Sequence, residues 1–208
     1  MYIKDPKVIE EKSLDLIEEV MGDVDFEERE KKIVKRMIHT TGDFEYRKIV
    51  EFRNDFVDHA LELIKKGSLI YTDTKMVNSG INKSAVYKFN CELVYFIDNN
   101  DVLEMAKRNG TTRSSASIDK AVDYGVEIFV IGNAPTALFR LMELIKEGKV
   151  DPKLIIAVPV GFVGAAESKE ALRELATHVP MVTTVGTKGG SNVAASIVNA
   201  LLYMVYDR

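Results

Sequence analysis

Two stretches in the second half of the chain repeat one pattern of hydrophobic and polar positions. Each begins with a short run rich in Ile and Val, Glu127–Gly132 in the first and Leu154–Val160 in the second, and continues through a turn into a longer segment. Apolar runs of this length are typical of strands buried on both faces, as in a parallel sheet. The longer segments, which end near Lys146 and Leu175, are expected to be helices. The pattern therefore predicts two consecutive strand–turn–helix units.

Further runs of the same kind extend this pattern over residues 68–208. We expect strands at Ser68–Asp73 and Leu93–Ile97, and a last strand that begins at Met181. Strands that alternate with helices form a parallel sheet covered on both faces. The sequence thus predicts an α/β fold, a three-layer α/β/α arrangement with a mainly parallel, doubly wound sheet of about five strands. The helices of this part are expected at 101–108, 113–124, 134–147, 163–176 and 190–206.

The first third of the chain is expected to be helical. Helices are predicted at Asp5–Met21, Glu27–Thr41 and Asn54–Lys66, and the first two carry an apolar stripe. A glycine follows each of the three, as is common at helix C-termini. For a chain of 208 residues the simplest expectation is one domain, with a helical part at 1–67 and a sheet part at 68–208.

Composition and charge narrow the classes of function. The net charge of -4 argues against a general binder of nucleic acid or of membrane surfaces. No apolar run reaches the roughly 18 residues that a membrane span needs, and the polar N-terminus does not resemble a signal peptide. Cys91 is the only cysteine, which excludes an intrachain disulfide and a cysteine metal cluster. We therefore expect a cytoplasmic protein.

Candidate ligand-binding residues follow the first predicted strand of the sheet. In open α/β sheets, ligands bind at the carboxyl ends of the strands, and free backbone N–H groups at helix N-termini favour anions. Asp73, Lys75 and Asn78 lie in this position. The alternative interpretation is that Asp73 caps a helix and that Lys75 is an ordinary solvated lysine.

Two glycine-rich turns are expected at the same edge of the sheet. Gly161-Phe162-Val163-Gly164 follows one predicted strand, and Gly186–Asn192 follows the last. Neither turn has the spacing of a dinucleotide-binding fingerprint or of a phosphate-binding P-loop. As isolated patterns, both are also compatible with simple turns.

Arg113 and the histidines are judged by their positions on helices. Arg113 follows Thr112 at a predicted helix N-terminus, where the dipole disfavours a cation unless it binds a carboxylate or phosphate; an ordinary surface arginine is an equal alternative. His39 lies at a helix C-terminus, where the dipole favours protonated imidazole, and from position alone it caps helix carbonyls. His59 and His178 are interpreted as surface residues. Three scattered histidines without carboxylates at ligand spacing predict no metal site.

Considered as a set, these stretches resemble the precorrin-8X methylmutase family, including its cobalt-precorrin-8 counterpart. The resemblance runs over nearly the whole chain and includes Ile131–Phe139 and Pro159–Lys169; its most specific parts are the long runs Gly132–Phe139 and Pro159–Lys169. The other matching segments are Tyr2–Ser13, Arg36–His39, Asp73–Gly80, Thr112–Ser114 and Gly189–Ser191.

The resemblance implies an isomerase of cobalamin biosynthesis that needs no added cofactor. The implied reaction moves a methyl group from C-11 to C-12 of the corrin ring and gives hydrogenobyrinate or cobyrinate. The family's catalytic histidine matches His39, and its substrate-contacting serine and arginine match Ser13 and Arg113. The resemblance also implies a homodimer with corrinoid sites near the subunit interface. The further residues expected to hold the carboxylates of the corrinoid are Lys75, Asn78, Asn133, Gly161, Gly164 and Gly190.

Two other functions remain open at this point. One is a corrinoid-binding carrier that performs no chemistry, since retention of a labile product would suit such a pathway. The other is a nucleotide-binding α/β enzyme, which the glycine turns suggest and the missing dinucleotide fingerprint argues against. Whether the substrate already holds cobalt does not follow from the sequence, because the metal would be carried by the macrocycle.

Overall fold

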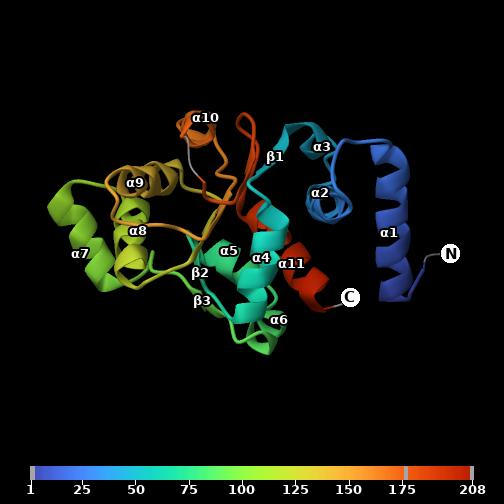
Figure 1. The fold of residues 1–208 in the computed structure, drawn as a ribbon, viewed down its shortest axis with the longest axis horizontal. Coiled ribbons are helices and arrows are strands. Elements are labelled where there is room, and N and C mark those ends of the chain that lie inside the picture. Colours follow the sequence, from blue (N-terminus) through green and yellow to red (C-terminus); the bar gives the residue numbers. More distant parts are fainter. Residues whose placement is uncertain (1–2, 176–177, 207–208) are drawn as a thin grey trace.

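The structure, a computed structural model, describes residues 3–175 and 178–206 and contains one mixed sheet (Figure 1). Tyr2 and the last position of the helix expected at 163–176 lie outside the described residues. Five strands are parallel, in the order β6-β5-β4-β2-β3, and β1 pairs with β6 in antiparallel orientation at one edge. The strands are β1 (Val50–Arg53), β2 (Leu69–Thr72), β3 (Glu92–Val94), β4 (Ile128–Ile131), β5 (Leu154–Ala157) and β6 (Met181–Thr184).

Helices cover both faces of this sheet and form the outer layers. The sheet separates two hydrophobic cores, one on each face. On β4, Ile128 and Val130 belong to one core, and Phe129 and Ile131 belong to the other. The first core includes side chains of α2, α4, α5, α6 and α11, and the second those of α7, α8, α9 and α10. The expected α/β/α layers are therefore confirmed. The helices are α1 (Pro6–Met21), α2 (Glu28–Thr41), α3 (Tyr46–Ile49), α4 (Phe56–Lys66), α5 (Lys75–Gly80), α6 (Lys83–Lys88), α7 (Asn100–Asn109), α8 (Arg113–Asp123), α9 (Pro135–Lys146), α10 (Ala165–Glu174) and α11 (Ser191–Tyr206).

The strand β1 corrects two expectations. The sheet has six strands among the described residues rather than about five, and the part at 1–67 is not entirely helical. The sequence Val50-Glu51-Phe52-Arg53 alternates apolar and polar positions, and only Val50 is buried. This pattern suits an edge strand, which lacks the continuous apolar run that identified the central strands. The division of the chain into a single domain stays a prediction.

Two smaller differences concern one strand and the short helices. The second expected strand, Leu93–Ile97, is shorter because the chain leaves the sheet after Val94 and turns, with the Asn99 N–H donating to Phe96 O at 2.9 Å. The expected helices also omit three short ones, α3 before β1 and α5 and α6 after β2. Helix α5 forms because the Thr74 hydroxyl accepts a hydrogen bond from the Val77 N–H at 3.2 Å, which caps its N-terminus.

The strand order creates a topological switch point at β2. The chain passes from β2 to β3 on one side, then returns to place β4 on the other side of β2. The crossover connections therefore reverse direction between β2 and β4. In open α/β sheets, ligands bind in the crevice at the carboxyl ends of the strands at such a point. The turns after Thr72 and Ile131 are thus the expected centre of a site.

The helix α11 is the central helix of the first core, whereas α1 lies at the far end of the molecule (Figure 1). α11 packs against α2, α4 and α5, and most of its residues are buried. α1 packs against α2 and buries only Ile17 and Met21. Its other face exposes Leu16 (61%) and Val20 (56%). An apolar helix face that the chain itself does not cover is typical of an interaction surface.

Candidate active site

Asp73 organises the switch point. It directly follows β2, its side chain is fully buried, and its two carboxylate oxygens accept the backbone N–H groups of Gly132 (3.1 Å), Asn133 (2.8 Å) and Ala134 (2.9 Å). Burial raises the pKa of the Asp73 carboxyl, while the three N–H donors act in the opposite direction. All three partners are donors, so they suit the ionised carboxylate. Asp73 therefore holds the turn between β4 and α9 and is not a helix cap.

The next residues of the same turn lie in different surroundings. Lys75 is exposed at the start of α5, in keeping with a solvated lysine that is also accessible to a ligand. Asn78 is almost completely buried, and its Oδ1 accepts a hydrogen bond from Lys83 Nζ at 2.9 Å. Among the described residues, Asn78 Nδ2 has no hydrogen-bond partner. The Thr74 and Ser191 hydroxyls are 3.2 Å apart, which joins this turn to the N-terminus of α11.

The two glycine turns pack against each other. The Gly161 N–H donates to Thr187 O at 3.2 Å, and the Gly190 N–H donates to Val158 O at 2.9 Å. At Gly189, a Cβ atom would lie 2.2 Å from Val158 O, so no other residue fits without moving the backbone. The turns therefore form one continuous edge that presents the N-termini of α10 and α11.

Lys188 connects this edge to the end of α2, where His39 lies. Its ammonium forms ion pairs with Asp43 and with Glu45 (2.6 Å), and both carboxylates raise the pKa of Lys188. His39 is exposed in the last turn of α2. Because Asp43 is only four residues further on, the ion pair brings the histidine's segment beside the turn that contains Gly190.

The structure does not support the interpretation of His39 as a helix cap. The carbonyl of Met37 accepts the Thr41 hydroxyl at 2.8 Å, and that of Ile38 accepts the Gly42 N–H at 2.7 Å. Gly42 has a φ of 68°, the left-handed conformation common at helix ends. Among the described residues the imidazole of His39 makes no hydrogen bond to a helix carbonyl, and it is exposed to solvent.

Arg113 lies at the start of α8, close to the start of α9. Thr112 caps α8 by accepting the Ser115 N–H at 3.1 Å, and its hydroxyl donates to Thr136 Oγ1 at 2.9 Å. Within the part of the chain that the structure describes, the exposed Arg113 guanidinium forms no ion pair. An uncompensated cation at a helix N-terminus is disfavoured by the dipole, which is consistent with a site for an anionic ligand.

Lys169 is a further residue of this edge that the sequence interpretation missed. It lies on α10 with 1% of its surface exposed, and its Nζ donates to Lys188 O (2.7 Å) and to Thr184 Oγ1 (3.1 Å). Burial lowers the pKa of its ammonium to about 8. Its spacing of four residues from Ala165 and three from Leu172, both buried, indicated the inner face of the helix.

These contacts arrange most of the expected residues along one edge of the sheet. We call this edge the rim. The order of residues along the rim follows from the contacts given above and from the close approach of Gly164 to Pro135, where a Cβ atom added to the glycine would lie 3.3 Å from Pro135 Cβ. Ser13 and Asn78 are the exceptions. Ser13 lies on α1 and its hydroxyl donates to Ile9 O at 2.7 Å within the same helix, and Asn78 is buried on α5. From one end to the other, the rim comprises His39, Lys188, Gly190, Gly161, Gly164, Asn133 and Arg113, with Lys75 on the turn after β2.

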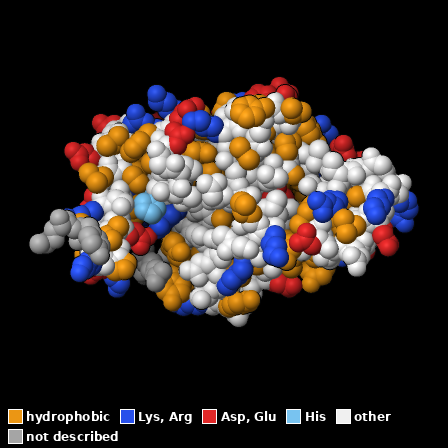
Figure 2. Space-filling view, turned by 180° about the vertical axis from the view of Figure 1, so that it is seen from behind, with side chains coloured by type: hydrophobic (Ala, Val, Ile, Leu, Met, Phe, Trp, Pro, Cys, Tyr) orange, Lys and Arg blue, Asp and Glu red, His pale blue; other side chains and the backbone are white. Residues whose placement is uncertain are grey.

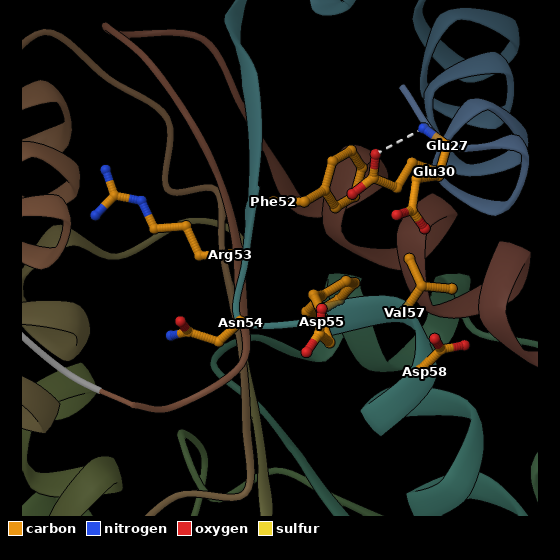
Figure 3. A pocket seen from close by; sticks show the side chains of 9 residues that line it. Glu27, Glu30, Phe52, Arg53, Asn54, Asp55, Val57 and Asp58 are labelled. Atoms are coloured by element: carbon orange, nitrogen blue, oxygen red, sulfur yellow. Dashed lines mark hydrogen bonds between the residues drawn. The ribbon is translucent and has the colours of Figure 1, made fainter. Parts of the chain in front are cut away.

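Several cavities among the described residues lie away from the rim. One pocket, with a volume of about 240 Å³, lies between α2 and β1–α4. Glu30 and Asp55 line it and bring negative charge to it (Figure 3). A groove of about 540 Å³ runs between α1, α2 and α11 and is lined by Leu14, Arg36 and Tyr203. Among the described residues, no group of three or more His, Cys, Asp or Glu could hold a metal ion. The acidic pocket does not suit a ligand with carboxylates, and in the groove the Arg36 guanidinium is already paired with Glu10 at 2.8 Å.

The surface of the molecule carries hydrophobic side chains between charged ones, and one histidine is visible beside a basic side chain on the face opposite to Figure 1 (Figure 2). In the described part of the chain, every helix is too short or too polar to cross a membrane.

The fold and the rim define an α/β protein with a candidate ligand site at the carboxyl edge of a doubly wound sheet. Comparison with protein families identifies the family to which the chain belongs. A family described as precorrin-8X methylmutase matches residues 8–204. The chain belongs to the precorrin-8X methylmutase family.

Individual relatives agree with this assignment over nearly their whole length. The chain is 44% identical to the cobalt-precorrin-8 methylmutase of Salmonella typhimurium, with 97% of each chain covered. It is 41% identical to the protein of that name from Leptospira interrogans, with 96% of this chain and 94% of the relative covered. The crystal structure of the precorrin-8X methylmutase from Thermus thermophilus superposes with a TM-score of 0.89, at 36% identity and 97% coverage of both chains.

Proposed function

We propose that this protein is an isomerase of cobalamin biosynthesis that moves a methyl group from C-11 to C-12 of the corrin ring. The observation that carries the proposal is the family match over residues 8–204. It is supported by the rim, on which the histidine and the arginine expected from the resemblance both lie. No added cofactor takes part in the proposed reaction, and the enzyme works in the cytoplasm.

The residues of the rim suit a large apolar ring with carboxylates around its edge. Arg113 and Lys75 are exposed cations, and Asn133 lies exposed in the turn held by Asp73. The N-termini of α10 and α11 add backbone N–H groups that favour anions. We therefore assign the carboxylates of the substrate to these groups, with the glycine turns at Gly161–Gly164 and Gly190 between them.

His39 is the proposed general acid and base. It donates a proton to the macrocycle, which withdraws electrons from the conjugated ring and allows the methyl group to migrate; the same proton then returns to His39. Substrate and product contain the same atoms, so no other reactant is needed. Histidine suits this role because it exchanges protons near neutral pH, and an exposed imidazole can reach a ligand on the rim.

We propose the cobalt-containing form, cobalt-precorrin-8, as the substrate. The relatives from Salmonella typhimurium and Leptospira interrogans both carry this name. The cobalt is part of the substrate, and the product is cobyrinate. The metal-free precorrin-8X, which would give hydrogenobyrinate, is the alternative.

Incubation of the purified protein with each of the two substrates tests the function. We expect cobalt-precorrin-8 to be converted to cobyrinate, as seen by visible absorbance and by separation of product. Binding of the corrinoid without conversion would indicate the carrier without catalysis. Absence of binding, combined with ultraviolet absorbance from a bound nucleotide, would favour the nucleotide-binding enzyme.

The proposed enzyme is a homodimer in which a second copy completes the site. Ser13 supports this part of the proposal, because it lies on α1 and makes its hydrogen bond within that helix. A partner subunit could bring its own serine to the rim. The exposed apolar side chains of α1, such as Leu16 and Val20, offer a surface for such a partner.

A further inference from the structure

The turn between β5 and α10 exposes two large apolar side chains. Phe162 has 94% and Val163 89% of its surface exposed to solvent. They lie between Gly161 and Gly164, whose φ angles of 145° and 81° are unusual for other residues. Burial of a Phe or Val side chain stabilises a fold, so two neighbouring side chains that nothing covers contribute little to the stability of this one.

This turn occupies the middle of the rim. On one side, the Gly161 N–H donates to Thr187 O at 3.2 Å, next to the lysine that connects to the segment of His39. On the other side, Gly164 packs against Pro135 at the start of α9. The next residue, Thr136, accepts a hydrogen bond from the Thr112 hydroxyl, directly before Arg113. Phe162 therefore lies between the proposed acid and the proposed carboxylate-binding arginine.

We infer that Phe162 and Val163 form the apolar contact for the flat face of the corrin macrocycle. The inference rests on the proposed function and extends it from the carboxylates to the ring. A ligand with an apolar centre and an anionic edge requires an apolar surface surrounded by N–H donors and cations. The Phe162–Val163 turn, with the N-terminus of α10 directly after it and Arg113 beyond, provides this arrangement.

A second copy of the chain is a less suitable occupant of this turn. Stable protein–protein interfaces bury about 1,200–2,000 Å² in total, far more than two side chains supply. The apolar face of α1, with Ile9, Leu16 and Val20 exposed, extends over about three helical turns and offers a larger surface for a partner. The Phe162–Val163 turn is therefore assigned to the ligand.

Substitution of the aromatic residue tests the inference. Phe162→Ala should raise the dissociation constant for cobyrinate, measured by visible absorbance titration, by about tenfold or more. Tyr87→Ala is the matched control, because Tyr87 on α6 is also an exposed aromatic residue (72%), and its dissociation constant should stay within about twofold of wild type. Both positions are exposed, so both variants should retain the wild-type circular dichroism spectrum and dimer fraction.

A tryptophan at the same position provides an independent readout. The chain contains no tryptophan, so Phe162→Trp introduces a single tryptophan, which can be excited selectively, and keeps an aromatic surface. It should bind cobyrinate with nearly wild-type affinity, and the ligand should shield it from acrylamide quenching of its fluorescence lifetime. Tyr87→Trp should show no such shielding.

Three outcomes would overturn the inference. These are an unchanged dissociation constant in Phe162→Ala, unshielded fluorescence in Phe162→Trp, and a loss of affinity that follows a loss of dimer in sedimentation. If wild type converts cobalt-precorrin-8 in these cases, only the inference about the turn fails. If wild type neither binds nor converts either corrinoid, the proposed function fails first.

Discussion

Single charged residues of the rim differ in what surrounds them, and this determines what their replacement should do. Arg113 is exposed and, among the described residues, has no carboxylate partner, so its charge is available to a ligand. Asp73 is fully buried and engaged by three N–H donors, so its charge serves the protein itself. Replacement of Arg113 is therefore expected to weaken ligand binding, and replacement of Asp73 to lower the stability of the fold.

Arg113→Ala should raise KM for cobalt-precorrin-8 by about tenfold and leave kcat nearly unchanged. The guanidinium would hold a carboxylate equally well in the substrate and in the transition state, and loss of such uniform binding affects KM alone. Steady-state kinetics measure both values. Arg108→Ala, at an exposed arginine in the last turn of α7, is the control and should behave like wild type. A large fall in kcat at unchanged KM would contradict this role of Arg113.

Asp73→Asn should lower the free energy of unfolding by about 1–3 kcal/mol, because an amide NH2 group would face backbone donors in place of an acceptor. The turn at Gly132–Ala134 should also shift and weaken cobyrinate binding. Urea unfolding and absorbance titration measure the two effects. Asp98→Asn replaces an exposed aspartate near β3 and should change neither quantity. Equal stability of Asp73→Asn and wild type would show that the three hydrogen bonds do not hold the turn.

At the scale of secondary-structure elements, the central strands and most helices could be predicted from the sequence, but the edge strand β1 could not. Continuous apolar runs identified β4 and β5, and glycines after α1 and α2 marked their ends. The alternating strand β1 lacked such a signal. The role of Asp73 could not be predicted, because its partners lie about 60 residues away and depend on the pairing of β2 with β4.

The candidate site was predicted in the same uneven way. Positions at the ends of predicted strands, such as Lys75 and Asn133, did fall on one edge, because parallel strands share their carboxyl ends. The interior position of Asn78 and the contact of Lys169 with the 186–190 turn depend on packing between helices, which spacing along the chain does not determine. The roles of the site residues in binding and catalysis stay predictions.

Lys169, whose buried ammonium on α10 donates to Lys188 O in the 186–190 turn, predicts a dependence of stability on pH. The pKa of Lys169 is about 8 in the folded protein, below its ordinary value of 10.5. Between these two pH values the unfolded chain binds the proton and the folded protein does not, so the free energy of unfolding rises with pH. Below about pH 8 both states are protonated, and the cost of the buried charge is fully present.

Comparison of wild type with Lys169→Met isolates this contribution. The free energy of unfolding of wild type, relative to that of Lys169→Met, should increase from pH 7 to pH 9.5 by about 1–2 kcal/mol. Denaturant unfolding at the two pH values gives the difference, in which other titrating groups cancel. A difference that does not change with pH would show that the lysine titrates normally.

At the scale of the whole molecule, the exposed face of α1 and the position of Ser13 predict a dimer. Leu16→Glu would place a charge in the proposed interface and should shift the protein to monomer in sedimentation experiments, with a loss of activity at the same concentration. Tyr87→Glu, on α6, should leave the dimer intact. A wild-type protein that is monomeric at micromolar concentration and fully active would contradict both the dimer and the shared site.

The central claim is that His39 supplies the proton for methyl migration on the rim. Its side chain is exposed and makes no hydrogen bond among the described residues, so His39→Ala should fold normally and still bind cobyrinate. The exposed His59 and His178 provide matched controls, and His59→Ala and His178→Ala should react like wild type.

The most direct test is the single-turnover rate of conversion of cobalt-precorrin-8 to cobyrinate with enzyme in excess. This measurement avoids slow product release, which could hide a defect in the chemical step. We predict that His39→Ala loses about 10²–10⁴-fold in this rate, the usual contribution of a general acid and base. A His39→Ala variant that converts the substrate at the wild-type single-turnover rate would contradict the mechanism.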